Sequence, residues 1–138
     1  MTQFLKKQAA GFYLSALSIL LAAVSAVACA VLAQDGENTP ALIYLLTAAG
    51  VVLTLAAAAF SRTRTGLAVY NTSPAAAAVL YALCLAVLLL GRLEWLGGLM
   101  AHNANFAPMH TAFYVTIALY VVTMLISIAA SFCKQVRD

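Results

Sequence analysis

The stretch DGENTPALIYLLTAAGVVLTLAAAAFSRTR, residues 35–64, sets the fold of this chain. It begins with two acidic residues, ends with two arginines, and has 24 uncharged residues between Glu37 and Arg62. A charged side chain at the centre of a bilayer costs about 2.5–3.5 kcal/mol, so charges are kept at the ends of a membrane helix. About 20 apolar residues cross the hydrocarbon core. The stretch therefore predicts one membrane-spanning helix.

The same pattern extends over the whole chain of 138 residues. All charged residues fall in five clusters with four long uncharged stretches between them: Lys6 and Lys7; Asp35 and Glu37; Arg62 and Arg64; Arg92 and Glu94; Lys134, Arg137 and Asp138. The chain is 65% hydrophobic and 8% charged, whereas soluble domains are about 45–50% apolar and about 25% charged. This composition excludes a soluble globule.

We therefore predict an all-α membrane protein, with four transmembrane helices in an antiparallel up-down bundle that forms a single membrane domain, 1–138. The expected helices are 9–33, 39–60, 73–99 and 108–132. The three prolines agree with this division, because Pro is favoured in the first turn of a helix. Asn38-Thr39-Pro40 and Thr72-Ser73-Pro74 each predict a capped helix start, and Asn105 with Pro108 predicts another.

The first span has an alternative interpretation as a secretory signal peptide, because Lys6 and Lys7 precede an apolar run. Val31-Leu32-Ala33 would then be the cleavage site. The apolar run of about 25 residues is longer than the usual signal core of about 7–15. A retained membrane helix is the preferred interpretation.

The basic residues predict the orientation. If the chain crosses four times, one side holds six basic residues, the expected topology determinants: Lys6, Lys7, Arg62, Arg64, Lys134 and Arg137. Positive residues mark cytoplasmic loops, so both termini are expected in the cytoplasm, with the protein in the plasma (inner) membrane. The net charge of +3 lies near the bilayer surface and predicts no nucleic-acid partner.

Small residues repeat at every fourth position in the spans, and small residues let membrane helices pack closely. The expected stripes are Ser18, Ala22, Ala26 and Ala30; Gly50, Thr54 and Ala58; Ala78, Ala82 and Ala86. The last span carries Thr116, Thr123, Ser127 and Ser131. These stripes are expected to face one another inside the bundle, or one of them faces outward as a docking surface. The three separate cysteines, Cys29, Cys84 and Cys133, are expected to act as small packing residues.

The polar segment RLEWLGGLMAHNANFAPMH, residues 92–110, is the candidate functional cluster on the outer side. Its polar members are Arg92, Glu94, His102, Asn103, Asn105 and His110. Span three is expected to continue to about Leu99, with a bend at Gly97-Gly98. Arg92 is expected either to reach lipid phosphates or to pair with Asp35 or Glu37 across the outer surface. A metal site on the histidines and an anionic ligand at Arg92 are weaker alternatives.

The sequence offers no motif for catalysis, and we expect no catalytic residue, cofactor or metal. No span has an Asp, Glu, Lys or His at its middle, which disfavours an ion-coupled carrier. The favoured hypothesis is a non-enzymatic accessory or assembly subunit of a larger membrane complex, in contact with the bilayer and with other membrane proteins or copies of itself. The alternatives are a small homo-oligomeric transporter or channel and, with less support, an enzyme with an outer site.

The segments FLKKQAAGFYLSAL, residues 4–17, and SIAASFCKQV, residues 127–136, resemble small four-helix integral membrane proteins of bacteria. The resemblance covers most of the chain and implies a bacterial plasma-membrane location. That group has no assigned activity, so the resemblance implies no ligand and no site residue.

Overall fold

The computed structural model describes residues 9–61, 63–101 and 110–136, and every regular element in this part of the chain is a helix. Four helices are long: α2 (Ala10–Gln34), α3 (Ala41–Phe60), α4 (Arg64–Leu90) and α6 (Thr111–Ser131). A short helix, α5 (Leu93–Met100), follows α4. At about 1.5 Å per residue, even the 20 residues of α3 reach about 30 Å, the thickness of the hydrocarbon core.

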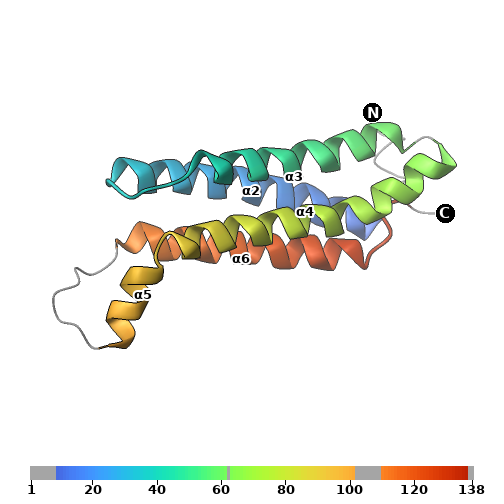
Figure 1. The fold of residues 1–138 in the computed structure, drawn as a ribbon. Helices are drawn as coiled ribbons and strands as arrows, with labels where there is room; N and C mark the ends of the chain where they lie inside the picture. Colours follow the sequence, from blue (N-terminus) through green and yellow to red (C-terminus); the bar gives the residue numbers. More distant parts are fainter. Residues whose placement is uncertain (1–8, 62, 102–109, 137–138) are drawn as a thin grey trace.

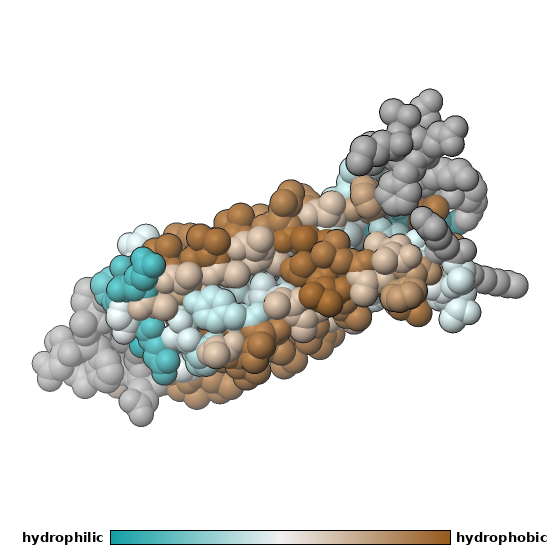
Figure 2. Space-filling view, turned by 90° about the horizontal axis from the view of Figure 1, so that it is seen from above, coloured by the Kyte–Doolittle hydropathy of each residue, from teal (hydrophilic) through white to brown (hydrophobic). Residues whose placement is uncertain are grey.

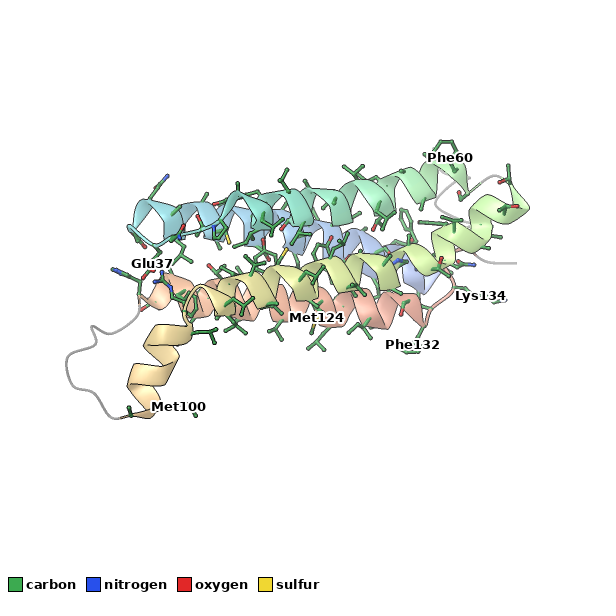
Figure 3. All side chains as sticks on the ribbon, viewed as in Figure 1. Glu37, Phe60, Met100, Met124, Phe132 and Lys134 are labelled. Atoms are coloured by element: carbon green, nitrogen blue, oxygen red, sulfur yellow. The ribbon has the colours of Figure 1, made fainter. Side chains whose placement is uncertain are left out.

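The four long helices are long and apolar enough to cross a membrane, which identifies the chain as a multi-pass membrane protein by length and composition. They lie side by side, and the start of α2 and the end of α6 lie at the same end of the bundle (Figure 1). The middle of the face seen in Figure 2 is mostly hydrophobic, and the strongest hydrophilic colour lies where α2 meets α3. We call that end, which carries Glu37, the Glu37 end, and the opposite one, which carries Lys134, the Lys134 end (Figure 3).

The helices do not pack equally against their neighbours. α2 packs mainly against α6, α3 packs mainly against α4, and α4 and α6 form the third large contact. α2 and α3 follow each other in the chain but have a much smaller contact. The bundle is therefore well closed on three sides and loosely closed between α2 and α3.

The buried residues of the long helices recur in alternating steps of four and three. On α2 they are Gly11, Ser15, Ser18, Ala22, Ser25, Cys29 and Leu32; on α3 Ile43, Thr47, Gly50, Thr54 and Ala57; on α6 Phe113, Thr116, Tyr120, Thr123, Ser127 and Ala130. On α4 the same steps connect Tyr70, Pro74, Ala77, Tyr81, Cys84 and Leu88, with Ser73 and Ala78 buried beside them. A repeat of 3.5 residues is the pattern of left-handed coiled-coil packing.

This repeat corrects the expected stripes of every fourth residue. In three of them the first residue is buried, but Ala30 and Ala86 at the far ends are exposed and Ala58 is half-buried. A step of four residues turns about 40° past a full turn of the helix, so a strict i, i+4 row winds off the buried face. Thr116, Thr123 and Ser127 are buried as expected, whereas Ser131 is half-buried.

Close approach at the centre of the bundle depends on Gly50. A Cβ atom at this position would lie 2.9 Å from Cε1 of Tyr81, closer than real side chains come. Tyr81 is itself fully buried, together with Ala22 of α2 and Ala77 of α4. Small residues on two helices therefore make room for one large aromatic ring on a third.

The expected start of the third span is wrong: α4 begins at Arg64, and Thr72-Ser73-Pro74 lies inside it. The N-cap is Thr63, whose side chain accepts a hydrogen bond from the Gly66 N–H. Pro74 has no N–H to donate to the carbonyl four residues before it, that of Tyr70. The Ser73 hydroxyl donates to this carbonyl instead, at 2.9 Å, and the first turns of α4 bend away from the rest (Figure 1). A helix therefore continues through a proline here.

Two further boundaries differ from the expected ones. The third span ends at Leu90 and not at Leu99. The bend lies at Gly91-Arg92, where α5 turns away from the bundle (Figure 1), and the expected bend position, Gly97-Gly98, is inside α5. α3 starts at Ala41 with Pro40 as its N-cap residue, and this cap has no side-chain hydrogen bond. The Pro40 carbonyl accepts from the Ile43 N–H instead. Asn105 and Pro108 lie outside the described residues.

Adjacent alanines on α2 test the heptad packing. Ala22 is fully buried and Ala23 is exposed. Ala22→Leu forces three extra carbon atoms into the packed core, for which we expect a loss of about 1–3 kcal/mol in stability. Ala23→Leu adds the same atoms on the outside and should leave stability unchanged. The melting temperature of each purified variant in mild detergent measures the effect, and equal melting temperatures would contradict this packing.

Candidate functional site

The candidate cluster at the Glu37 end has Arg92 at its centre. Arg92 lies in the turn between α4 and α5, where its Nη2 forms an ion pair with Oε2 of Glu37 in the link between α2 and α3. Both side chains are largely buried, at 22% and 13% exposure. Of the expected fates of Arg92, the structure therefore shows pairing with Glu37.

The Arg92 guanidinium also lies over an aromatic ring, with its Cζ 5.9 Å from the ring centroid of Phe113. Phe113 is in the first turn of α6 and is 4% exposed. A guanidinium over a ring at this distance gains about 0.5–2 kcal/mol, more as it loses water. One side chain thus joins the α2–α3 link, the α4–α5 turn and the start of α6.

Among the other members of the expected cluster, His110 alone has a side chain in the described part. Glu94 is in α5, two residues after Arg92, and its side chain lies outside the described part. His102, Asn103 and Asn105 lie outside it as well. His110 is the exposed N-cap residue of α6 and forms no side-chain cap. No group of three or more His, Cys, Asp or Glu residues gathers among the described residues.

The predicted topology determinants are described in part. Lys134 is exposed and lies at the end opposite Glu37 (Figure 3). Arg64 is the first residue of α4, with its side chain outside the described part. Lys6, Lys7, Arg62 and Arg137 lie outside the described residues.

A second polar cluster, which the sequence did not predict, lies deep between the long helices. The Thr47 Oγ1 is 2.7 Å from the Tyr120 hydroxyl and 3.5 Å from the Cys84 Sγ. The Cys84 thiol also donates to the Ile43 carbonyl. Three side chains and one backbone carbonyl from α3, α4 and α6 therefore meet in one network.

The network is part of a row of inward hydroxyl groups. One turn away, Ser25 on α2 and Thr123 on α6 approach to 3.4 Å. The hydroxyls of Thr47, Thr54 and Thr123 each donate to a carbonyl four residues earlier in their own helix. Two buried hydroxyls among the described residues, those of Tyr81 and Ser127, have no hydrogen-bond partner.

A third site, at the Lys134 end, is formed by the residues after α6. Gln135 is fully buried, and its side chain accepts from the Ser15 hydroxyl at 3.0 Å and donates to the Ala130 carbonyl at 3.0 Å. Its backbone N–H donates to Oδ1 of Asn71 on α4. Gln135 thus connects α2, α4 and α6. No sequence motif predicted these contacts of Gln135, because a single glutamine after a helix is common in proteins.

The first turn of α2 fits against the same segment. The N–H groups of Ala9 and Gly11 donate to the carbonyls of Gln135 and Lys134, both at 3.1 Å. A Cβ at Gly11 would lie 2.6 Å from the Lys134 carbonyl oxygen and 2.7 Å from that of Cys133. The start of α2 can therefore approach this segment only with glycine at position 11. We call residues 133–136 the C-terminal clasp.

In all three sites the described contacts bind protein groups to one another. The ion pair lies at one end of the long helices, and the deep network consists of hydroxyl and thiol groups that connect α3, α4 and α6. The arrangement can hold helices in a fixed register and at short range.

We expect Arg92 and Glu37 to depend on each other. Arg92→Gln leaves a largely buried carboxylate without its cation and removes the contact with Phe113, so stability should fall by about 1–3 kcal/mol. Glu37→Gln should destabilise as well, and the double variant should lose less than the sum of the two. Thermal unfolding in detergent measures the coupling. Asp35→Asn, at an exposed neighbouring position, is the control, and strictly additive losses would show that the two side chains do not interact.

The comparisons with known proteins bring no further identification. No family model, no curated protein and no solved structure matches this chain.

Proposed function

We propose that this protein is a non-enzymatic accessory or assembly subunit of a larger membrane complex. The observation that carries the proposal is a groove of about 240 Å³ on the outer face between α4 and α6. Three alanines line one wall, and the whole lining is Ala75, Ala78, Val79, Ala82, Met124, Ile128, Ser131 and Phe132. Membrane helices associate by close packing at small residues, since lipid gives them no hydrophobic drive.

The alanine stripe of α4 supports this docking face. Ala78 is buried in the bundle, Ala82 is half-buried and Ala86 is exposed, so the stripe winds from the inside to the outside of the molecule. Two large side chains, Val79 at 61% and Phe132 at 86% exposure, stand beside the groove. A partner helix would find small residues to pack against and two large ones to fit around.

In the membrane, we propose an antiparallel up-down bundle in the bacterial plasma membrane with both termini in the cytoplasm. The Lys134 end would then be cytoplasmic and the Glu37 end would face outward. The support is the distribution of charge: acidic and paired groups are at the Glu37 end, and Lys134 and Arg64 are at the other. Basic residues are retained on the cytoplasmic side during insertion.

Fusions of alkaline phosphatase, which is active only outside the cytoplasm, test this orientation. A fusion after Asp138 should be inactive, and a fusion within residues 102–106, between α5 and α6, should be active. Activity at the C-terminus would overturn the orientation. Replacement of all four basic residues Lys6, Lys7, Arg62 and Arg64 by neutral residues should weaken the preference for this orientation. The activity of the C-terminal fusion should then rise.

Photo-crosslinking tests the accessory role. A photoreactive phenylalanine at Val79 is expected to form a crosslink to one other membrane protein in native membranes. The same residue at Leu45, which is 66% exposed on α3, is the control and should give no discrete product. Purification in mild detergent should recover the same partner. Recovery of the protein alone or only as a self-oligomer would contradict the proposal.

The second candidate, a small homo-oligomeric transporter or channel, is favoured by one observation. The interior holds the hydroxyls of Thr116, Thr123 and Ser127 in one row on α6, and those of Ser127 and Tyr81 have no partner in the described part of the chain. A self-oligomer that moves an ion or small solute in liposomes would establish this function in place of the accessory role.

A further inference from the structure

The loosely packed side of the bundle forms a groove between α2 and α3. Its volume is about 350 Å³, and it lies in the half of the bundle toward the Lys134 end. The lining comes from three helices: Phe12, Ser15, Ala16, Ile19 and Leu20 of α2; Thr54, Leu55 and Ala58 of α3; Tyr70 of α4. A groove at this place is open to the lipid around the bundle.

The lining presents hydrocarbon to whatever fills the groove. Two of its hydroxyls are already used inside the protein, since Ser15 donates to Oε1 of Gln135 and Thr54 donates to the Gly50 carbonyl. Water needs two to four polar partners to occupy a cavity. An apolar groove at membrane depth is therefore filled by an apolar group.

The lining of the groove favours a hydrocarbon chain over a helix. Several of its side chains are large, namely those of Phe12, Ile19, Leu20, Leu55 and Tyr70. Membrane helices associate closely where small residues let their backbones approach, as in the alanine-lined groove between α4 and α6. A hydrocarbon chain has a narrower cross-section and can lie along the groove between Phe12 and Leu20.

The basic residues at this end of the bundle indicate the head group. The carbonyl of Lys134 accepts from the N–H of Gly11, the residue before Phe12, so the backbone of the exposed Lys134 lies beside the start of α2, at the end of the helix from which Phe12 lines the groove. In the sequence, Lys7 precedes the start of α2 by three residues, and Arg64 is the first residue of α4. Cationic side chains near the surface attract anionic lipids, by about 1 kcal/mol each.

We propose that the α2–α3 groove binds one acyl chain of an anionic phospholipid, with the lipid phosphate at Lys134. The site is separate from the α4–α6 docking face and does not depend on the accessory role. Bound lipid would fill the one side of the bundle where protein contacts are few, and so would stabilise α3 against α2.

Native mass spectrometry of the full chain in detergent tests the proposal. The delipidated protein is titrated with phosphatidylglycerol and with phosphatidylcholine of the same acyl chains. We expect one tightly retained phosphatidylglycerol per chain and weaker retention of phosphatidylcholine. Equal retention of the two lipids, or competition by inorganic phosphate alone, would overturn the proposed combination of chain and head group.

Two neighbouring alanines on α3 give matched variants. Ala58 lines the groove, whereas Ala59 is exposed and is not part of the lining. Ala58→Phe should fill the groove and weaken phosphatidylglycerol binding about tenfold, and Ala59→Phe should bind as the unmodified protein does. Lys134→Gln should reduce the preference for the anionic lipid about fivefold, the loss of about 1 kcal/mol, while phosphatidylcholine binding persists. If Ala58→Phe binds phosphatidylglycerol as tightly as the unmodified protein does, or changes only in oligomeric state, the proposed binding site is wrong.

A fluorescence measurement keeps the test independent of whether Ala58→Phe folds. Phe12→Trp in a Trp95→Phe background places the single tryptophan in the groove. Phosphatidylglycerol with dibrominated acyl chains should quench it with saturation at a low mole fraction. A tryptophan at Tyr114, an exposed position on α6, is the control and should be quenched in proportion to the lipid. Proportional quenching at both positions would contradict a binding site.

Discussion

The interior of a membrane protein must satisfy its polar groups without water, and this constraint shapes the whole bundle. Lipid is as apolar as leucine, so the helices are not driven together by hydrophobicity. In this chain most of the serine and threonine side chains of the long helices are buried between the helices, while large exposed residues such as Leu45 and Leu20 face outward. Serine and threonine serve two purposes at once. Their hydroxyls bond to their own helix, and their small size lets the next helix approach.

The two ends of the bundle are held by different chemistry. At the Glu37 end, the link between α2 and α3 is joined to α4 and α6 by a charged pair and a ring contact. At the Lys134 end, the neutral Gln135 side chain and backbone bond to Ser15, Ala130 and Asn71. A charged pair is tolerated at the Glu37 end because the side chains of Arg92 and Glu37 both remain partly exposed. A fully buried position favours a neutral amide, which can be satisfied by neutral partners alone.

The sequence predicted the elements that depend on composition, and it failed where geometry decides. Charge spacing located four spans, with several ends within two residues of the observed ones, because a charge in the hydrocarbon core is costly wherever it lies. The start of α4 was predicted wrongly because of Pro74. A proline fits at a helix start, but it also fits inside a helix when a hydroxyl group bonds to the carbonyl that the proline leaves without a donor, as Ser73 does for Tyr70. The stripes failed because alanine is abundant in every span, so only the 3.5-residue repeat separates inside from outside. The position of Gln135 depends on the fold of a turn that no local pattern encodes.

The weak side of the bundle follows from where the connections lie. α2 and α3 are joined by a short link at the Glu37 end, which keeps their near halves together. At the Lys134 end the clasp bonds α2 to α4 and α6, and the described contacts include none that ties α3 to it. α3 is joined there to α4 through the turn at Ser61 and Thr63. Few contacts therefore hold α2 and α3 together far from their link, and the groove lies in the half of the bundle toward the Lys134 end. An apolar opening of this kind, at the end of the bundle that carries Lys134, is where we propose that lipid becomes a component of the packing.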